Sequence, residues 1–248
     1  MKAITHLRKV VRNRLAARLG VPEIPTGLDL LKRQGFIPEL VFDVGAYRGE
    51  FARACLARWP RAAIACFDAQ PEAIRSLKRL ADSRPNISVH STLLGEAKCA
   101  EVPFHEAETA SSVLAERQGP GHKKTTRPMT TVDHVTGELF SNKSPNLLKL
   151  DVQGYELQVL KGAVRSLPSI EVVLSEVNLL DIHLHVPLLA DIVSWLDERD
   201  FVAYDICGLT RRPLDGALWQ TDIVFVKRDS AFRQDKRWQS GPAVANHA

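Results

Sequence analysis

The stretch VFDVGAYRGE, residues 41–50, shows the pattern of a buried strand that runs into a glycine turn. Apolar residues lead to Asp43, and Gly45 and Gly49 follow with three residues between them. In open α/β sheets, ligands bind beyond the carboxyl ends of the strands. We therefore expect Asp43, Gly45, Tyr47 and Gly49 to lie at a ligand, and the spacing bears on what that ligand is.

The spacing of the two glycines argues against a phosphate ligand. A dinucleotide site uses G-x-G-x-x-G, so that backbone N–H groups reach a pyrophosphate, and a P-loop ends in G-K-S or G-K-T. Neither pattern is present here. The carboxylate of Asp43 would repel a pyrophosphate and would suit a ligand with a cationic amine, while the glycines allow close backbone approach.

The next apolar stretch ends in CFDAQP, with Asp68 at its tip. A carboxylate at this point can accept hydrogen bonds from both hydroxyls of a ribose. A ribose beside an ammonium group, without a pyrophosphate, describes S-adenosyl-L-methionine. Two alternatives stay open on this evidence, namely a tight turn with a solvated Asp68 and an unusual dinucleotide site.

Charge is unevenly placed along the 248 residues, whose formal net charge is +4. Residues 1–20 hold six Lys or Arg and no acid, and the remainder is nearly neutral. Such a body is not expected to bind nucleic acid, which favours a basic face. The basic arm has helical periodicity, and we expect it either to pack on the body or to contact an anionic lipid or an acidic carrier.

The protein is expected to be cytoplasmic, with contact of the arm at the inner membrane face as an alternative. The four cysteines form no C-x-x-C pair, which is typical of a reduced compartment. No run of 18 apolar residues is present, and the N-terminus lacks the apolar core of a secretion signal.

From residue 40 onward, strand and helix patterns alternate, which predicts an α/β fold with a parallel sheet covered on both faces. The expected strands are 40–44, 62–68, 87–90, about 101–105, 147–152, 171–177, 201–207 and 222–228. The expected helices are 51–59, 71–80, 155–167 and 188–199. The last two strands have no helix between them and should be antiparallel.

The same patterns suggest three parts of the chain. Residues 1–39 form the basic helical arm, 40–228 the main domain, and 229–248 a tail that we expect to be partly disordered. Residues 117–128 are rich in Gly, Pro and Lys, and we expect a polar loop there that closes over an acceptor.

A series of motifs resembles the FkbM family of S-adenosylmethionine-dependent methyltransferases. The motifs are VFDVGAYRGEF, CFDAQP, SSVL (111–114), TTVDHV (130–135), LLKLDVQGYELQVLKGA (147–163) and VVLSEV (172–177). The resemblance implies the class I methyltransferase fold, a Rossmann-like, mostly parallel sheet of seven strands with an antiparallel last strand. It also implies O-methylation of a hydroxyl on a sugar, glycolipid or natural-product acceptor, and a role near the cofactor or acceptor for the region of Ser112. One departure is Gln153, where the family usually has an acidic residue.

Methyl transfer to a sugar hydroxyl needs a base, or a metal that acidifies the hydroxyl. Asp151, at the tip of the strand 147–152, is the first candidate, with capping of the next helix as its alternative role. Lys149 lies within the same strand and needs a carboxylate partner, for which Glu176 is the predicted residue. We expect Lys149 and Glu176 to form a structural or electrostatic pair.

The segment SEVNLLDIHLH, residues 175–185, offers His183 and His185 as further candidates for the base. Their spacing matches no recognised zinc pattern, so no metal is assigned. Two other classes of function remain open. A non-catalytic binding protein could keep the fold, and a sugar-modifying NAD enzyme is weakened by the missing third glycine and the absence of a Tyr-x-x-x-Lys pair at Tyr155.

Overall fold

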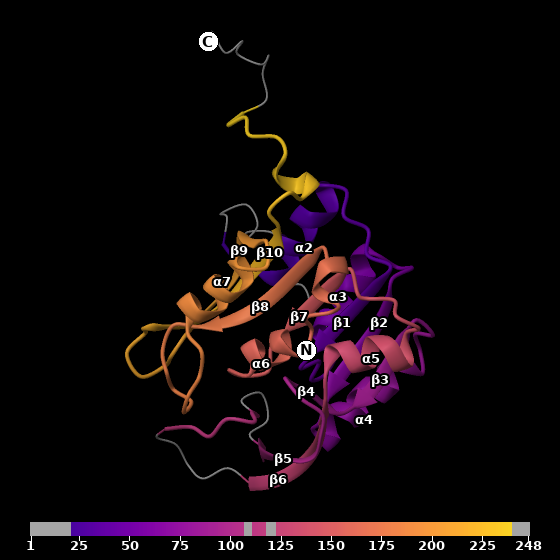
Figure 1. Ribbon diagram of the computed structural model, residues 1–248, viewed down its shortest axis with the longest axis vertical. Helices are drawn as coiled ribbons and strands as arrows, with labels where there is room; N and C mark the ends of the chain where they lie inside the picture. Colours follow the sequence, from indigo (N-terminus) through magenta and orange to yellow (C-terminus); the bar gives the residue numbers. More distant parts are fainter. Residues whose placement is uncertain (1–20, 107–110, 118–122, 240–248) are drawn as a thin grey trace, which may run out of the picture.

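The computed structural model describes residues 21–106, 111–117 and 123–239 (Figure 1). The predicted basic arm, residues 1–20, lies outside the described residues, as do 107–110, 118–122 and 240–248. No helix in the described ranges has both the length and the apolar character to cross a membrane.

The centre of the molecule is a seven-stranded sheet with the strand order β3-β2-β1-β7-β8-β10-β9. Its strands are β1 (Leu40–Val44), β2 (Ala63–Asp68), β3 (Ile87–Ser91), β7 (Leu147–Leu150), β8 (Val172–Asn178), β9 (Phe201–Arg211) and β10 (Leu218–Lys227). The last strand, β10, is antiparallel to both of its neighbours, β8 and β9, while the pairs from β3 to β8 are parallel. The predicted mostly parallel sheet with an antiparallel last strand is confirmed.

Helices cover both faces of this sheet, so β1 and β7 are buried along their whole length. One apolar core joins the sheet to α2 (Ile24–Arg33), α3 (Glu50–Arg58) and α4 (Pro71–Ala81). The other joins it to α5 (Val132–Leu139), α6 (Glu156–Lys161) and α7 (Leu189–Asp197). Successive residues of a strand enter opposite cores, which explains the nearly continuous apolar runs in the sequence.

Helix α2 lies within residues 1–39, which were predicted to form a helical arm separate from the main domain. Pro25 stands in the first turn of α2, where a missing N–H costs little. Leu28 and Leu31 are fully buried against the sheet and α3. This segment therefore contributes to the body of the fold.

The predicted tail begins with packed residues. A 3-10 helix, η3 (Ala231–Arg233), places the ring of Phe232 edge-on to that of Phe36, with 6.0 Å between the centroids. A second short helix, η2 (Leu167–Ser169), follows α6, which is shorter than the predicted helix 155–167.

A smaller sheet of three strands lies beside the main one, at the lower end of the molecule in Figure 1. It consists of β4 (Leu93–Leu94), β5 (Cys99–Glu106) and β6 (Lys123–Thr130), in the order β4-β6-β5. The prediction of a loop over 117–128 is wrong for 123–128, which belong to β6. Strand β6 is half-exposed and pairs with β4 and β5, so it tolerates polar residues. The absence of an apolar run in the sequence therefore did not exclude a strand here.

Candidate active site

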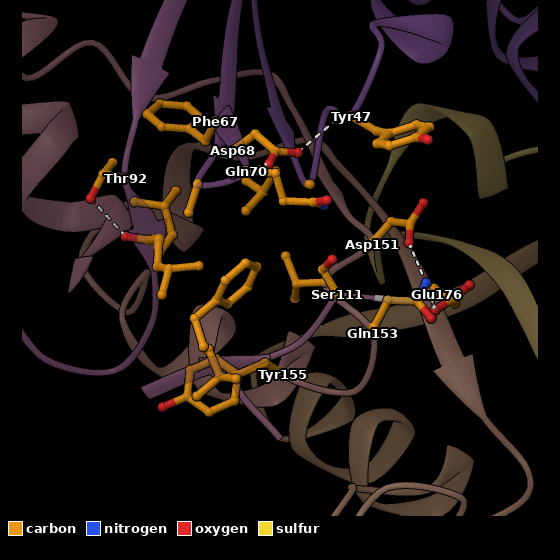
Figure 2. A pocket seen from close by; sticks show the side chains of 18 residues that line it. Tyr47, Phe67, Asp68, Gln70, Thr92, Ser111, Asp151, Gln153, Tyr155 and Glu176 are labelled. Carbon is orange, nitrogen blue, oxygen red and sulfur yellow. Dashed lines mark hydrogen bonds between the residues drawn. The ribbon is translucent and has the colours of Figure 1, made fainter. Parts of the chain in front are cut away.

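A cavity lies at the carboxyl ends of β1, β2, β7 and β8 (Figure 2). Gly45, Tyr47 and Asp68 lie on the wall formed by β1 and β2. Asp151 and Glu176 lie on the wall formed by β7 and β8. The cavity thus occupies the position at which an open α/β sheet binds its ligand.

The glycine turn brings the two walls into contact. Gly45 has a φ of 75°, and a Cβ at this position would lie 1.8 Å from the carbonyl oxygen of Asp151. Its N–H donates to the carbonyl of Phe67 at 3.0 Å. Gly49 has a φ of 78° and precedes α3, and a Cβ there would lie 2.7 Å from Leu80. Only glycine allows these approaches with these backbone angles.

Asp68 fixes the shape of this turn. Its Oδ2 accepts a hydrogen bond from the backbone N–H of Tyr47, and its Oδ1 accepts one from that of Gln70, both at 2.9 Å. Burial raises the pKa of Asp68, and these backbone donors oppose the shift. Each carboxylate oxygen has a second lone pair, so a further donor such as a ribose hydroxyl can be bound. The ribose role of Asp68 stays a prediction.

Asp43 and Lys149 form a buried ion pair behind the cavity wall. Lys149 Nζ lies 3.2 Å from Asp43 Oδ1 and 3.4 Å from Asp151 Oδ2, and it donates to the carbonyl of Gly45 at 2.9 Å. Asp43, which was expected to lie at the ligand, is instead fully buried and does not line the cavity, because it pairs with Lys149. Burial lowers the pKa of Lys149, but the carboxylates of Asp43 and Asp151 outweigh it, and the net shift is upward.

The predicted pairing of Lys149 with Glu176 is wrong. In the register of β1 against β7, Asp43 stands directly opposite Lys149, whereas Leu174 is the opposite residue on β8. The ammonium group of Lys149 therefore pairs with Asp43. Glu176 lies two residues further along β8, at the cavity.

Gln153 joins the two carboxylates of the β7–β8 wall. Its Nε2 donates to Asp151 Oδ1 at 3.0 Å and to Glu176 Oε2 at 3.1 Å (Figure 2). Gln220, on β10, donates to the same Oε2 of Glu176 at 2.6 Å. Gln153, where the resemblance implied an acidic residue, is thus the link between Asp151 and Glu176. Sequence reasoning missed Gln220, because only the pairing of β10 with β8 brings it to the site.

The turn after β7 is held by Glu156. Glu156 Oε1 accepts the backbone N–H groups of Val152 at 2.9 Å and Gly154 at 3.1 Å. Burial raises the pKa of Glu156 to about 7, against the effect of these donors. Glu156 therefore holds the turn that precedes α6, and the carboxylate of Asp151 lines the cavity.

Two further predicted residues, Ser112 and His183, do not line the cavity. Ser112 is buried, and its hydroxyl donates to the carbonyl of Gln153 at 2.8 Å, while its neighbour Ser111 lines the cavity. His183 is 1% exposed, and its backbone pairs with that of Glu116. Within the described ranges, no three His, Cys, Asp or Glu side chains are grouped as for a metal ion.

The fold and the site define a class I methyltransferase. Residues 43–203 match the family model described as the methyltransferase FkbM domain. The chain belongs to the FkbM methyltransferase family, as its motifs predicted, and S-adenosyl-L-methionine is confirmed as the expected cofactor.

Two known proteins illustrate the similarity. A curated relative, the hexuronic acid methyltransferase AglP of Haloferax volcanii, is 24% identical over 153 residues, which is 60% of each chain. The chain thus spans about 60% of the length of this relative. The crystal structure of the methyltransferase FkbM from Methylobacillus flagellatus KT superposes with a TM-score of 0.52 and 17% identity, over 75% of this chain and 43% of that one. The superposition supports the fold alone.

Proposed function

We propose that this protein transfers the methyl group of S-adenosyl-L-methionine to a hydroxyl oxygen of a sugar, in a free glycan, a glycolipid or a glycosylated natural product. The observation that carries the proposal is the pair of carboxylates, Asp151 and Glu176, on a cavity wall that faces the glycine turn. The name of the relative from Haloferax volcanii, a hexuronic acid methyltransferase, supports a sugar acceptor.

The residues of the cavity fit the proposed cofactor. Gly45 lets a ligand approach the backbone, and Asp68 has lone pairs left for two ribose hydroxyls. Phe67 and Leu94 add apolar surface for a flat base. When bound, the cofactor supplies a methyl group that is already activated by the positive charge on sulfur.

The protein then has two tasks, which are to place the acceptor and to receive its proton. A sugar hydroxyl is a weak nucleophile unless its proton is accepted during the attack. Asp151 and Glu176 supply carboxylate oxygens for this purpose, and Lys149 keeps a positive charge behind Asp151. Holding the acceptor in line with the methyl group is the larger part of the catalysis.

The proposal is tested by incubating purified protein with methyl-labelled cofactor and three probes: methyl glucuronide, methyl glucoside and a glycolipid extract of the source cells. We expect one probe class to gain the label and a mass increase of one methyl group per acceptor. The Asp68→Ala variant is the control, because it should lose the transfer through weaker cofactor binding. Binding of the cofactor in calorimetry with no transfer to any sugar probe would contradict the proposal and would favour a binding protein.

The basic arm bears on the partner of this reaction. Residues 1–20 carry six positive charges, and we propose that they bring the enzyme to an anionic membrane surface or carrier that presents the acceptor. Sedimentation with vesicles of anionic and of neutral lipid, for the full chain and for a chain that begins at residue 21, tests this. Equal sedimentation of the two chains with anionic vesicles would contradict it.

A further inference from the structure

Glu176 is held in an unusual way for a buried carboxylate. Two amide groups, those of Gln153 and Gln220, donate to a single oxygen, Oε2, at 3.1 and 2.6 Å. Within the described residues, Oε1 accepts no hydrogen bond, and Glu176 lines the cavity. The carboxylate is thus oriented through one oxygen, which leaves the other available to a ligand.

The turn that carries Gln153 is built to aim this amide. Gln153 has a φ of 54°, a left-handed backbone conformation that is unfavourable for residues other than glycine. Ser112 donates to its carbonyl, and Glu156 accepts the N–H groups on either side of it, from Val152 and Gly154. These three contacts fix the backbone and leave the amide pointing at the carboxylates.

The two carboxylates have different electrostatic surroundings. Asp151 lies 3.4 Å from the ammonium of Lys149, and its side chain is 35% exposed. Within the described residues, no cation lies within ion-pair distance of Glu176, which is 8% exposed. A buried carboxylate without a cation beside it binds a proton more strongly than one in water.

The groups that face Glu176 come from three elements. Burial raises the pKa of Glu176 well above its usual value, and Asp151, Glu156 and Asp222 add to the rise, while Lys149 opposes it. The direction agrees with the geometry, since the charged neighbours of Glu176 are mostly acids and its direct contacts are neutral amides.

We propose that Glu176 is the catalytic base of the transfer, that Asp151 orients the acceptor hydroxyl, and that Gln153 and Gln220 are positioning residues for Glu176. The inference rests on the proposed function and assigns its chemistry. The hydroxyl oxygen forms a bond to the methyl carbon while the bond from that carbon to sulfur breaks, its electron pair remaining on sulfur. The hydroxyl proton goes to Oε1 of Glu176, and solvent later takes it up.

The division of roles predicts different kinetic defects. Glu176→Gln should lower kcat by about 100- to 10,000-fold, the usual contribution of a general base. Asp151→Asn should mainly raise the KM for the acceptor. In the wild type, kcat should rise with pH as Glu176 loses its proton. Gln153→Ala and Gln220→Leu should move this rise to higher pH, because each removes a donor that favours the charged carboxylate.

A second measurement needs no acceptor. The carboxyl carbon of Glu176 can be titrated by carbon-13 NMR in the free protein, with its signal assigned by its loss in Glu176→Gln. We expect the titration to move to higher pH in Gln153→Ala and furthest in Gln153→Glu, which places a third carboxylate in contact. Gln234→Glu adds the same charge at an exposed position and should leave the titration unchanged. Binding of S-adenosylhomocysteine by calorimetry confirms that each variant is folded.

The outcomes separate the two levels of the proposal. Absence of transfer in the wild type contradicts the proposed function, and the titration then decides the positioning role alone. Transfer with full kcat in Glu176→Gln contradicts the assignment of the base. A titration that is the same in the wild type, Gln153→Ala and Gln220→Leu contradicts the positioning role.

Discussion

The two walls of the cavity hold their carboxylates by different means. On the β1–β2 wall, Asp68 accepts hydrogen bonds from the backbone N–H groups of Tyr47 and Gln70. Gln70 is close to Asp68 in the sequence, and Tyr47 is brought to it by the parallel pairing of β1 with β2. On the β7–β8 wall, Asp151 and Glu176 are contacted by side chains. The donor Gln220 is 44 positions away from Glu176.

The difference teaches which wall is fixed and which can vary. Backbone donors hold a carboxylate wherever the chain turns in the same way, so the β1–β2 wall is tied to the fold. Side-chain donors such as Gln153 and Gln220 can be exchanged without moving the backbone. We infer that the first wall serves the common cofactor and that the second is adapted to one reaction and acceptor.

The largest effect on stability is expected from breaking the buried ion pair of Lys149 with Asp43. Lys149→Met leaves Asp43 buried without a cation, and it should lower the free energy of unfolding by about 3 to 5 kcal/mol. Urea denaturation followed by circular dichroism measures this. The double variant Lys149→Met with Asp43→Leu should recover most of the loss, because no unpaired charge remains. An equally unstable double variant would show that Lys149 acts mainly through Gly45 and Asp151.

Contact between the walls gives the next largest effect. In Gly45→Ala, the new methyl group would meet the carbonyl of Asp151, and the positive φ adds backbone strain, so we expect a loss of about 2 to 4 kcal/mol. Gly35→Ala is the matched control. Gly35 also has a positive φ, of 90°, but nothing lies within 4 Å of its Cβ position, so only the strain of about 1 kcal/mol should appear. Equal losses would mean that the walls are not in contact.

The same contrast explains what the sequence could predict. The glycine turn and Asp68 are held by local backbone contacts, so their spacing predicted a site at the strand tips, where the structure has a cavity. Burial of Lys149 between apolar residues predicted a carboxylate partner. The choice of Asp43 over Glu176 depended on strand register, which no local pattern contains.

Errors in the fold have a similar origin. The strands of the main sheet and the helices α3, α4, α6 and α7 follow hydrophobic periodicity and were predicted, whereas α2 and α5 were not. Helix α2 was missed because Pro25 signals either the end or the first turn of a helix, and only packing of Leu28 and Leu31 on the sheet decides between them. Strand β6 was missed because its polar residues are stabilised by pairing with β5, about 20 positions earlier in the chain.

A test of the first wall is the affinity for the cofactor. Asp68→Ala removes the acceptor for two backbone N–H groups and the predicted ribose ligand, so the Kd for S-adenosylhomocysteine should rise about 10- to 100-fold, or about 1.4 to 2.7 kcal/mol. Isothermal titration calorimetry measures the change. Glu176→Gln, on the other wall, should bind the same ligand with little change. A reversed order of the two affinities would contradict the assignment of the walls.

The smallest effect concerns Asp222 on β10, which stands opposite Glu176 of β8 and accepts no backbone hydrogen bond from the described residues. Burial, with the charge of Asp151, raises its pKa from 3.8 to about 6. Between these pH values the folded protein keeps a proton that the unfolded chain has released, so stability falls as the pH rises from about 4 to about 6. Asp222→Asn should remove this fall and stabilise the protein at pH 7 by about 1 to 2 kcal/mol. Urea denaturation between pH 4 and pH 7 measures this change in stability.

Asp215→Asn is the control. The hydrogen bond from Arg212 holds the pKa of Asp215 below its usual value, so the effect of this substitution on stability should be constant above pH 4. A difference between Asp222→Asn and the wild type that does not change with pH would contradict the raised pKa of Asp222.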